Sequence, residues 1–154
     1  MANIAQIVNV LQSMILMRGD KMVLTPTYYV FEMYRPHQDA TFLPLDIDTP
    51  TRTVRDDRVV PVVDATASCD ADGRIHLSLV NIDIDKAQKV RISLDEVKPT
   101  RVSGTILTSK KIIDLNTFEK PNCVKPESFK NAKIAGGAIE VTLPAHAIVA
   151  LEIE

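Results

Sequence analysis

The spacing of apolar residues changes near Phe42, and this change constrains the fold more than any other feature of the sequence. Before it, apolar residues recur at intervals of three and four, as on one face of an α-helix. The residues of this stripe are Ile4, Ile7, Val8, Leu11, Met14 and Ile15. They predict a helix over about residues 3–17 that ends near Gly19.

Two further elements are predicted before the change of spacing. Met22–Leu24 is a short apolar run, which is typical of a buried strand. Thr25 followed by Pro26 favours a helix start, because Thr caps helix N-termini and Pro fits the first helical position. We therefore predict a second helix up to Arg35. The order helix, strand, helix is typical of α/β architectures with parallel strands.

After Phe42 apolar and polar residues alternate, which is the pattern of half-buried β-strands. The alternating segments are 43–47, 59–67, 75–79, 90–94, 102–107, 139–143 and 148–153. Asp70–Gly73 and Gly136-Gly137 are typical of hairpin turns, and Lys110–Lys133 of a polar surface loop. The sequence thus predicts a mainly β chain, a jelly-roll-type β-sandwich over residues 39–154, preceded by an α-β-α segment over residues 1–38.

The segment 1–38 is not expected to be stable alone. A three-residue strand has no sheet to join, and parallel strands are normally covered on both faces. The apolar stripe also needs a partner surface, since each fully buried aliphatic side chain contributes about 1.5–3 kcal/mol. That surface is the sandwich, a second copy of the chain, or a further part of a longer protein, and the abrupt start in a helix favours the last. Without it we expect residues 1–38 to pack in a non-native way, to dimerise or to be poorly ordered, and a closed unit with no exposed apolar patch would contradict the fragment hypothesis.

The overall composition excludes several kinds of partner. The 154 residues include 18 Lys and Arg against 20 Asp and Glu, and this balance gives no electrostatic footprint for nucleic acid or an anionic membrane. The apolar runs are shorter than the roughly 20 residues of a membrane helix. Cys69 and Cys123 lack metal-site spacing, and no phosphate-binding or dinucleotide motif is present. The sequence predicts no cofactor and no metal.

Acidic residues two apart are the sharpest candidates for chemistry, because on a strand each pair shares one face. The pairs are Asp46/Asp48, Asp70/Asp72 and Asp83/Asp85. Such oxygen clusters bind calcium in some loops. However, the twelfth position counted from Asp70 holds Asn81 rather than the Glu of a calcium loop, and a simple turn is favoured there.

Histidines and aromatic residues offer weaker candidates. His37, His76 and His146 fall on different predicted elements and form no recognisable nucleophile arrangement. His76 stands between two apolar residues of a predicted strand, so we expect it to face solvent. Four aromatic residues at helical spacing favour core packing over a sugar-stacking platform, and both interpretations remain open; they are Tyr28, Tyr29, Phe31 and Tyr34.

Three segments, in order along the chain, are distinctive as strings. They are Asn3–Gln12, Leu24–Tyr34 with His37–Ala40, and Val141–Leu151. Together with Leu79–Asn81 they closely resemble the C-terminal part of family 51 α-L-arabinofuranosidases, and the resemblance covers essentially the whole chain. It implies a C-terminal fragment: the last part of a (β/α)8 barrel in residues 1–38, then the β-sandwich. On that template residues 3–17 are the penultimate barrel helix, and the missing partner surface is the rest of the barrel.

The resemblance also implies an activity for the parent protein. Family members hydrolyse terminal α-L-arabinofuranosyl residues of arabinan and arabinoxylan with retention, using two glutamates. Both glutamates lie before the region represented here, and Glu32 matches neither, so the chain is expected to contain no catalytic residue and to be inactive alone. Gln6 matches a family glutamine that reaches the arabinose, and it is the one substrate-binding candidate. The family's usual His is replaced here by Tyr29.

Three functional hypotheses follow. The first is a non-catalytic accessory domain that packs on and stabilises the barrel, through which arabinose-containing glycans are reached. The second is a free carbohydrate-binding module, which the few aromatic residues of the β region disfavour; these are Phe42, Phe118 and Phe129. The third is a complete small enzyme with an unrecognised site. The resemblance implies a bacterial parent, cytoplasmic or exported, and a homo-oligomer formed through residues 1–38 is a further expectation.

Overall fold

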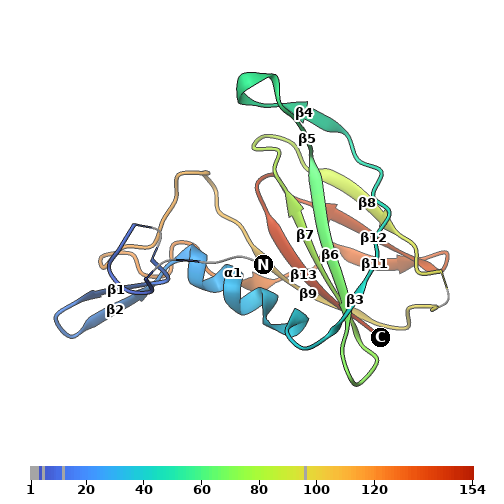
Figure 1. Ribbon diagram of the computed structural model, residues 1–154, viewed down its shortest axis with the longest axis horizontal. Helices are drawn as coiled ribbons and strands as arrows, with labels where there is room; N and C mark the ends of the chain where they lie inside the picture. Colours follow the sequence, from blue (N-terminus) through green and yellow to red (C-terminus); the bar gives the residue numbers. More distant parts are fainter. Residues whose placement is uncertain (1–3, 5, 12, 96) are drawn as a thin grey trace.

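Two antiparallel sheets and two separate hairpins make up most of the chain in a computed structural model, which describes residues 4, 6–11, 13–95 and 97–154 (Figure 1). The six-stranded sheet has the order β10-β9-β13-β7-β6-β3. Its strands are β3 (Thr41–Leu43), β6 (Val63–Cys69), β7 (Ile75–Asn81), β9 (Val102–Leu107), β10 (Glu127–Ser128) and β13 (Ile148–Ile153). The three-stranded sheet has the order β11-β12-β8, with β8 (Gln88–Ile92), β11 (Ala132–Ala135) and β12 (Ala138–Leu143).

The two sheets face each other across one apolar core, which confirms the predicted β-sandwich. Alternate residues of β7, β12 and β13 point into it, as the two-residue period requires. Ile139, Leu143 and Val149 are completely buried there. The predicted hairpin turns are also present: Gly73 has φ +83°, and Gly136 and Gly137 have φ +58° and +77° between β11 and β12. Only glycine adopts such angles without strain.

The opposite face of the six-stranded sheet lies under helix α1 (Pro26–Tyr34), which continues into the 3-10 turn η1 (Arg35–His37) (Figure 1). Met33 of α1 packs with Leu107 and Val124, and Ile148 and Ala150 of β13 adjoin them. The six-stranded sheet is therefore covered on both faces. Pro26 occupies the predicted start of the helix, but the hydroxyl of Thr25 does not cap it.

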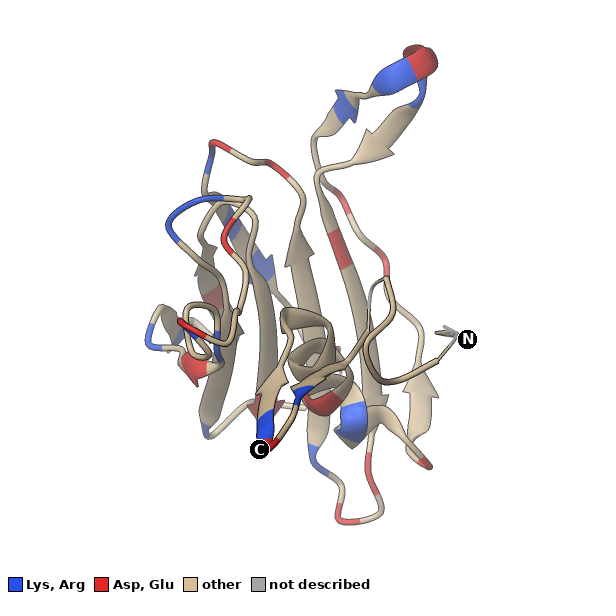
Figure 2. Cartoon of the chain, turned by 90° about the vertical axis from the view of Figure 1, so that its left-hand side faces the viewer, with Lys and Arg blue, Asp and Glu red and all other residues tan. Residues whose placement is uncertain are grey.

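A second hairpin projects from the sandwich (Figures 1 and 2). It is formed by β4 (Thr51–Thr53) and β5 (Val59–Pro61), and the turn η2 (Arg55–Asp57) at its tip carries charged residues of both signs. Pro61 ends β5 before β6 begins, as expected of a residue that has no N–H group to donate within a sheet. None of the helices among the described residues is long and apolar enough to cross a membrane.

The prediction of a first helix and a parallel strand is wrong. Residues 15–24 form an antiparallel hairpin of β1 (Ile15–Arg18) and β2 (Lys21–Leu24), and the described residues before it are not helical. Gly19, with φ +61°, occupies the first position of the two-residue turn rather than a helix stop. An isolated helix of about 12 residues is marginal in water, so helical spacing of apolar residues does not by itself secure a helix.

Candidate interaction surface

The segment before the hairpin is held by backbone pairing instead of helical bonds. The Ile15 N–H donates to the Ile7 carbonyl at 3.1 Å, and the Asn9 N–H donates to the Ile15 carbonyl at 3.0 Å. The Asn9 side chain completes the arrangement, since its amide donates to the Met17 carbonyl and its Oδ1 accepts from the Met17 N–H. The backbone around Asn9 thus pairs with β1 as a short extra strand would.

Thr25 fixes the hairpin to the start of α1. Its hydroxyl lies 2.7 Å from the Ser13 carbonyl and 3.2 Å from that of Met14, and its N–H also donates to Met14. The side chain is therefore used to hold the preceding loop, which explains why it caps no helix N–H group. Thr25, which the sequence predicts as a helix cap, instead joins the loop before β1 to the start of α1.

The long loop between β9 and β10 joins the same end of the molecule. Asn116 is buried, and its amide donates to the carbonyls of Leu24 and Val124 at 2.9 and 2.8 Å. On the surface Arg18 forms an ion pair with Glu119 at 3.0 Å and lies 4.2 Å from the ring centre of Phe118. This loop, predicted as a surface loop, therefore supports the hairpin.

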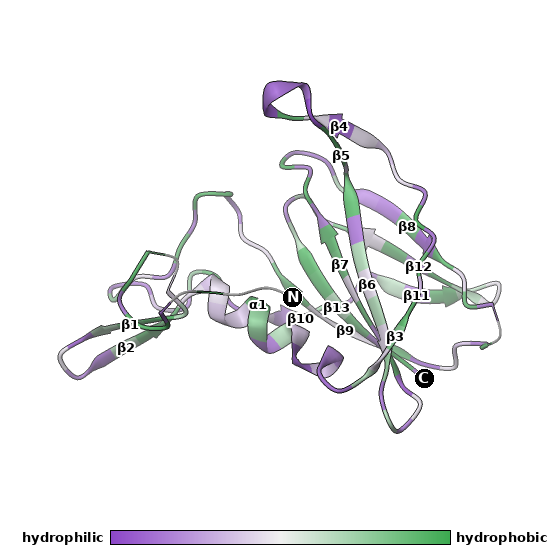
Figure 3. Cartoon of the chain, viewed as in Figure 1, coloured by the Kyte–Doolittle hydropathy of each residue, from purple (hydrophilic) through white to green (hydrophobic). Residues whose placement is uncertain are grey.

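These three segments expose many large apolar side chains at one end of the molecule (Figure 3). Leu11 is 90% exposed and Ile113 is 76% exposed. We define the docking surface as the following exposed residues: Ile7, Val8, Leu11, Met17, Met22, Phe31, Ile112, Ile113 and Leu115. Clustered apolar side chains of this kind mark interaction sites rather than ordinary surface. Residues 1–38 therefore do not form a closed unit without an exposed apolar patch.

Polar groups beneath α1 fasten the helix to the sheet. The Nδ1 of His37 lies 2.7 Å from the Ser68 hydroxyl, and its Nε2 lies 2.8 Å from the Ser78 hydroxyl. Burial and the neighbouring His76 lower the pKa of His37, so the neutral ring donates to one serine and accepts from the other. Because Ser78 is completely buried, this arrangement is structural and offers no nucleophile to a substrate.

His76 does not face solvent, contrary to the prediction. Only 8% of it is exposed, because α1 and η1 cover the face of the sheet on which it lies. Its Nε2 donates to Asp70 Oδ2 at 2.9 Å, and this hydrogen bond is the main reason that the pKa of Asp70 falls to about 2. Asp70 also accepts from the backbone N–H groups of Asp72 and Arg74. Its oxygens hold the β6–β7 turn, as the interpretation of Asp70–Gly73 as a turn requires.

The other two acidic pairs lie in a turn and in an irregular segment. Asp83 accepts from the N–H groups of Asp85 and Lys86 and lies 3.8 Å from Arg52, so it orders a turn. Asp46 and Asp48 lie in an irregular segment after β3. Among the described residues no three His, Cys, Asp or Glu side chains come together as a metal site would require.

The aromatic residues of α1 do not form one stacking face. Tyr29 and Tyr34 pack toward the cluster around Met33, and Phe31 points outward. Tyr28 and Tyr29 meet edge to face at 5.6 Å. In the β region Phe129 is buried in the core and Phe118 lies beside Arg18, which leaves Phe42 as the exposed ring among the described residues there. The structure does not favour a sugar-binding platform.

Gln6 is exposed in an irregular segment, where it has φ +59°. The prediction of a helix over residues 3–17, which would include Gln6, is therefore wrong here, and the role of Gln6 toward arabinose stays a prediction. Glu32 lies on α1 beside a cleft that Arg35, His76 and Glu152 also line. No sequence signal pointed to this cleft or to the His37 network, because both arise from the packing of α1 on the sheet.

Known proteins match this chain over its full length. Residues 1–147 match the family described as the α-L-arabinofuranosidase C-terminal domain. The chain is 58% identical over 154 residues to an intracellular exo-α-L-arabinofuranosidase of Bacteroides ovatus, covering 100% of this chain and 30% of that protein. The family 51 arabinofuranosidase of Xanthomonas axonopodis pv. citri superposes with a TM-score of 0.94 at 46% identity, over 100% of this chain and 31% of that one.

A more distant structure has the same fold. The α-L-arabinofuranosidase of Thermotoga maritima, solved with arabinose, has a TM-score of 0.84 at 25% identity, over 97% of this chain and 33% of that one. The chain spans about a third of the length of each of these relatives. From the match of residues 1–147 and from the shared fold, this chain belongs to the α-L-arabinofuranosidase C-terminal domain family.

Proposed function

We propose that this chain is the non-catalytic C-terminal unit of an α-L-arabinofuranosidase and that it packs on the catalytic barrel and stabilises it. The observation that carries this proposal is the match of the entire chain to about a third of proteins named arabinofuranosidases. The exposed apolar side chains of the docking surface also support the proposal, because burying Leu11 alone against the barrel would contribute about 1.5–3 kcal/mol. We further propose the division into a remnant of the barrel, residues 1–38, and the C-terminal β-sandwich domain, residues 39–154.

The chemistry of the proposed parent lies outside this chain. Retaining glycosidases need a nucleophile and a general acid/base whose carboxyl groups lie about 5–5.5 Å apart. In the proposal both glutamates belong to the barrel, which removes terminal α-L-arabinofuranosyl groups from arabinan or arabinoxylan. The contribution of the present chain is to hold the barrel closed, with Gln6 as a candidate contact to the sugar once residues 1–14 are covered by the barrel.

A complementation assay tests the proposal. The 154-residue chain and the barrel are produced separately, and hydrolysis of 4-nitrophenyl α-L-arabinofuranoside is followed for each and for their mixture. We expect no turnover by the chain alone, and a mixture with higher activity and thermal stability than the barrel alone. Turnover by the chain after repurification would show that a catalytic pair lies within it.

Matched variants locate the contact. Leu11→Asp and Ile113→Asp place charges on the docking surface and should weaken the association strongly. Val59→Asp places the same charge on another exposed apolar residue, on the projecting hairpin, and should leave the association unchanged. Equal effects of all three variants would place the contact elsewhere.

A further inference from the structure

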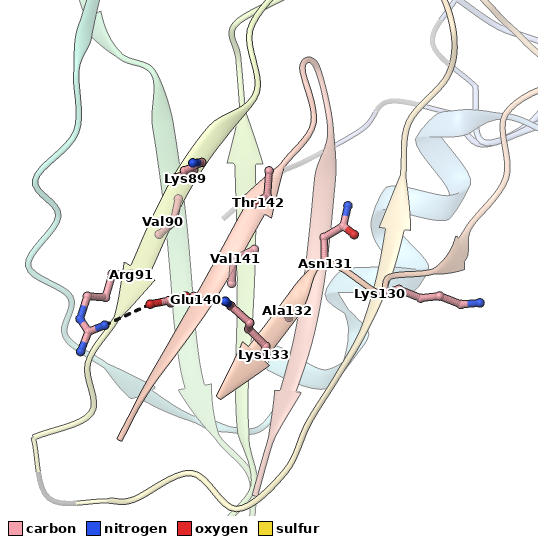
Figure 4. Close-up of a pocket in the computed structure, with 10 residues that line it drawn as sticks. All are labelled: Lys89, Val90, Arg91, Lys130, Asn131, Ala132, Lys133, Glu140, Val141 and Thr142. Atoms are coloured by element: carbon pink, nitrogen blue, oxygen red, sulfur yellow. Dashed lines mark hydrogen bonds and ion pairs between the residues drawn. The ribbon is translucent and has the colours of Figure 1, made fainter. Parts of the chain in front are cut away.

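A groove of about 680 Å³ runs along the outer face of the three-stranded sheet, on the side away from the core (Figure 4). Its cationic side chains are Lys89 and Arg91 of β8 and Lys133 of β11. Lys130, just before β11, lies at the edge of the groove, and its ammonium group points away from the other side chains (Figure 4). The carboxylate among the lining residues is that of Glu140, so the groove holds three positive charges to one negative, in a chain whose formal net charge is −2.

Strand register arranges these groups in two rows across the sheet. Glu140 lies opposite Arg91 on one side and Lys133 on the other. Its two oxygens contact both, Oε1 at 3.5 Å from Arg91 and Oε2 at 3.1 Å from Lys133 (Figure 4). The second row holds Lys89 opposite Thr142. Neighbouring strands are about 4.8 Å apart, so the first row, over three strands, spans about 10 Å of the sheet and the second, over two strands, about 5 Å.

The pairing leaves positive charge available. Glu140 neutralises one of its two cationic partners and holds both in place. In the part of the chain that the structure describes, Lys89 has no acidic side chain within ion-pair distance. The groove therefore presents a net charge of about two, together with the hydrogen-bonding side chains of Asn131 and Thr142.

The lining chemistry limits the class of ligand. None of the described lining residues is aromatic, so neither a nucleobase nor the flat face of a neutral sugar finds a stacking partner. Lysine and arginine recognise carboxylates by charge-assisted hydrogen bonds, and the amide and hydroxyl groups suit sugar hydroxyls. An anionic group joined to a chain of hydroxyls satisfies both parts of the groove.

We propose that this groove binds an acidic oligosaccharide, one that carries a uronic acid carboxylate. The inference rests on the proposed function in one respect, because a glycan-degrading parent supplies the glycan. The groove lies on the sandwich, whereas the docking surface lies at the other end of the molecule (Figure 1). A uronate site there would retain the enzyme on charged branches of its polymeric substrate.

The test compares two probes that differ by one uronic acid. The 154-residue chain is titrated with xylotriose bearing one glucuronic acid and with xylotriose itself, followed by amide chemical shifts. We expect the acidic probe to shift the Asn131 and Thr142 resonances, to bind at least about tenfold more tightly than xylotriose, and to weaken as salt rises. Inorganic phosphate and a short DNA duplex are run as further probes.

Charge variants complete the design. Lys89→Gln removes one cation without breaking an ion pair and should weaken binding of the acidic probe about tenfold. The control, Lys110→Gln, removes the same charge from an exposed position outside the groove and should change nothing. Equal binding of both sugars, tighter binding of phosphate or DNA, no binding, or equal loss in the control would each overturn the proposal. Failed complementation with intact binding would instead count against the proposed function alone.

Discussion

The sandwich core and the N-terminal hairpin region are both rich in large apolar residues, yet their side chains have very different surroundings. Leu143 of β12 is completely buried between the two sheets, whereas Leu11, ahead of β1, is 90% exposed. In the sandwich each apolar face meets another face of the same chain, and the hydrophobic contribution is realised on folding. In the hairpin region that contribution is still available, and this difference is what makes the region suitable for binding.

The same Leu→Ala substitution, made once in each region, tests this difference most directly. Leu143→Ala should lower the free energy of unfolding by about 2–5 kcal/mol, because it removes buried methyl groups and leaves a cavity. Leu11→Ala should change it by less than about 0.5 kcal/mol, because an exposed side chain loses little. Chemical denaturation followed by circular dichroism measures both. Similar losses in the two variants would mean that Leu11 is covered in solution by a second copy or by another part of the chain.

A smaller effect is expected where the two regions are joined. His37→Ala should lower the free energy of unfolding by about 1–3 kcal/mol, because the buried hydroxyls of Ser68 and Ser78 lose their partner. Gln38→Ala serves as the control, because Gln38 is the exposed residue that follows η1, and it should have little effect. Amide hydrogen exchange in α1 should rise in the His37 variant and remain unchanged in the control. Unchanged exchange in both variants would show that apolar contacts alone hold the helix.

The smallest effect concerns pH and the β6–β7 turn. The pKa of Asp70 is 3.8 in its ordinary state and about 2 in the folded chain, so the unfolded chain binds more protons between these values. The contribution of Asp70 to stability is therefore complete above about pH 4 and is lost as the pH falls toward 2. Asp70→Asn should show a shallower decline of the denaturation midpoint over this window than the unmodified chain. Parallel declines would mean that His76 and Arg74 do not favour the ionised carboxylate.

The strands of the sandwich could be predicted from the sequence, whereas the structure of the N-terminal hairpin region could not. Two-residue alternation identified the strands around Leu77, Val141 and Leu151, because one face of each is buried within the chain and the pattern records that burial. The stripe from Ile4 to Ile15 has helical spacing, but spacing states only which residues would share a face. In the folded chain, local pairing through Asn9 and the Gly19 turn determines the structure instead.

The candidate sites were predictable to different degrees. The turn at Asp70 was evident because Asp and Gly have local roles that need no tertiary information. His76 was misjudged because its burial depends on a helix some 40 residues earlier that returns to cover the sheet. The groove on the three-stranded sheet was not visible either, since Lys89, Lys133 and Glu140 become neighbours only through strand register.

The position of β13 has a consequence for how the protein is made. It is the last of the strands along the chain, yet it lies between β7 and β9 in the six-stranded sheet. Until it has emerged from the ribosome, that sheet exists as two unconnected halves, each with an unpaired edge open to other chains. The six-stranded sheet therefore becomes continuous only after β13 has been made, and a chain that stops before Ile148 lacks the strand that joins the halves rather than a dispensable tail.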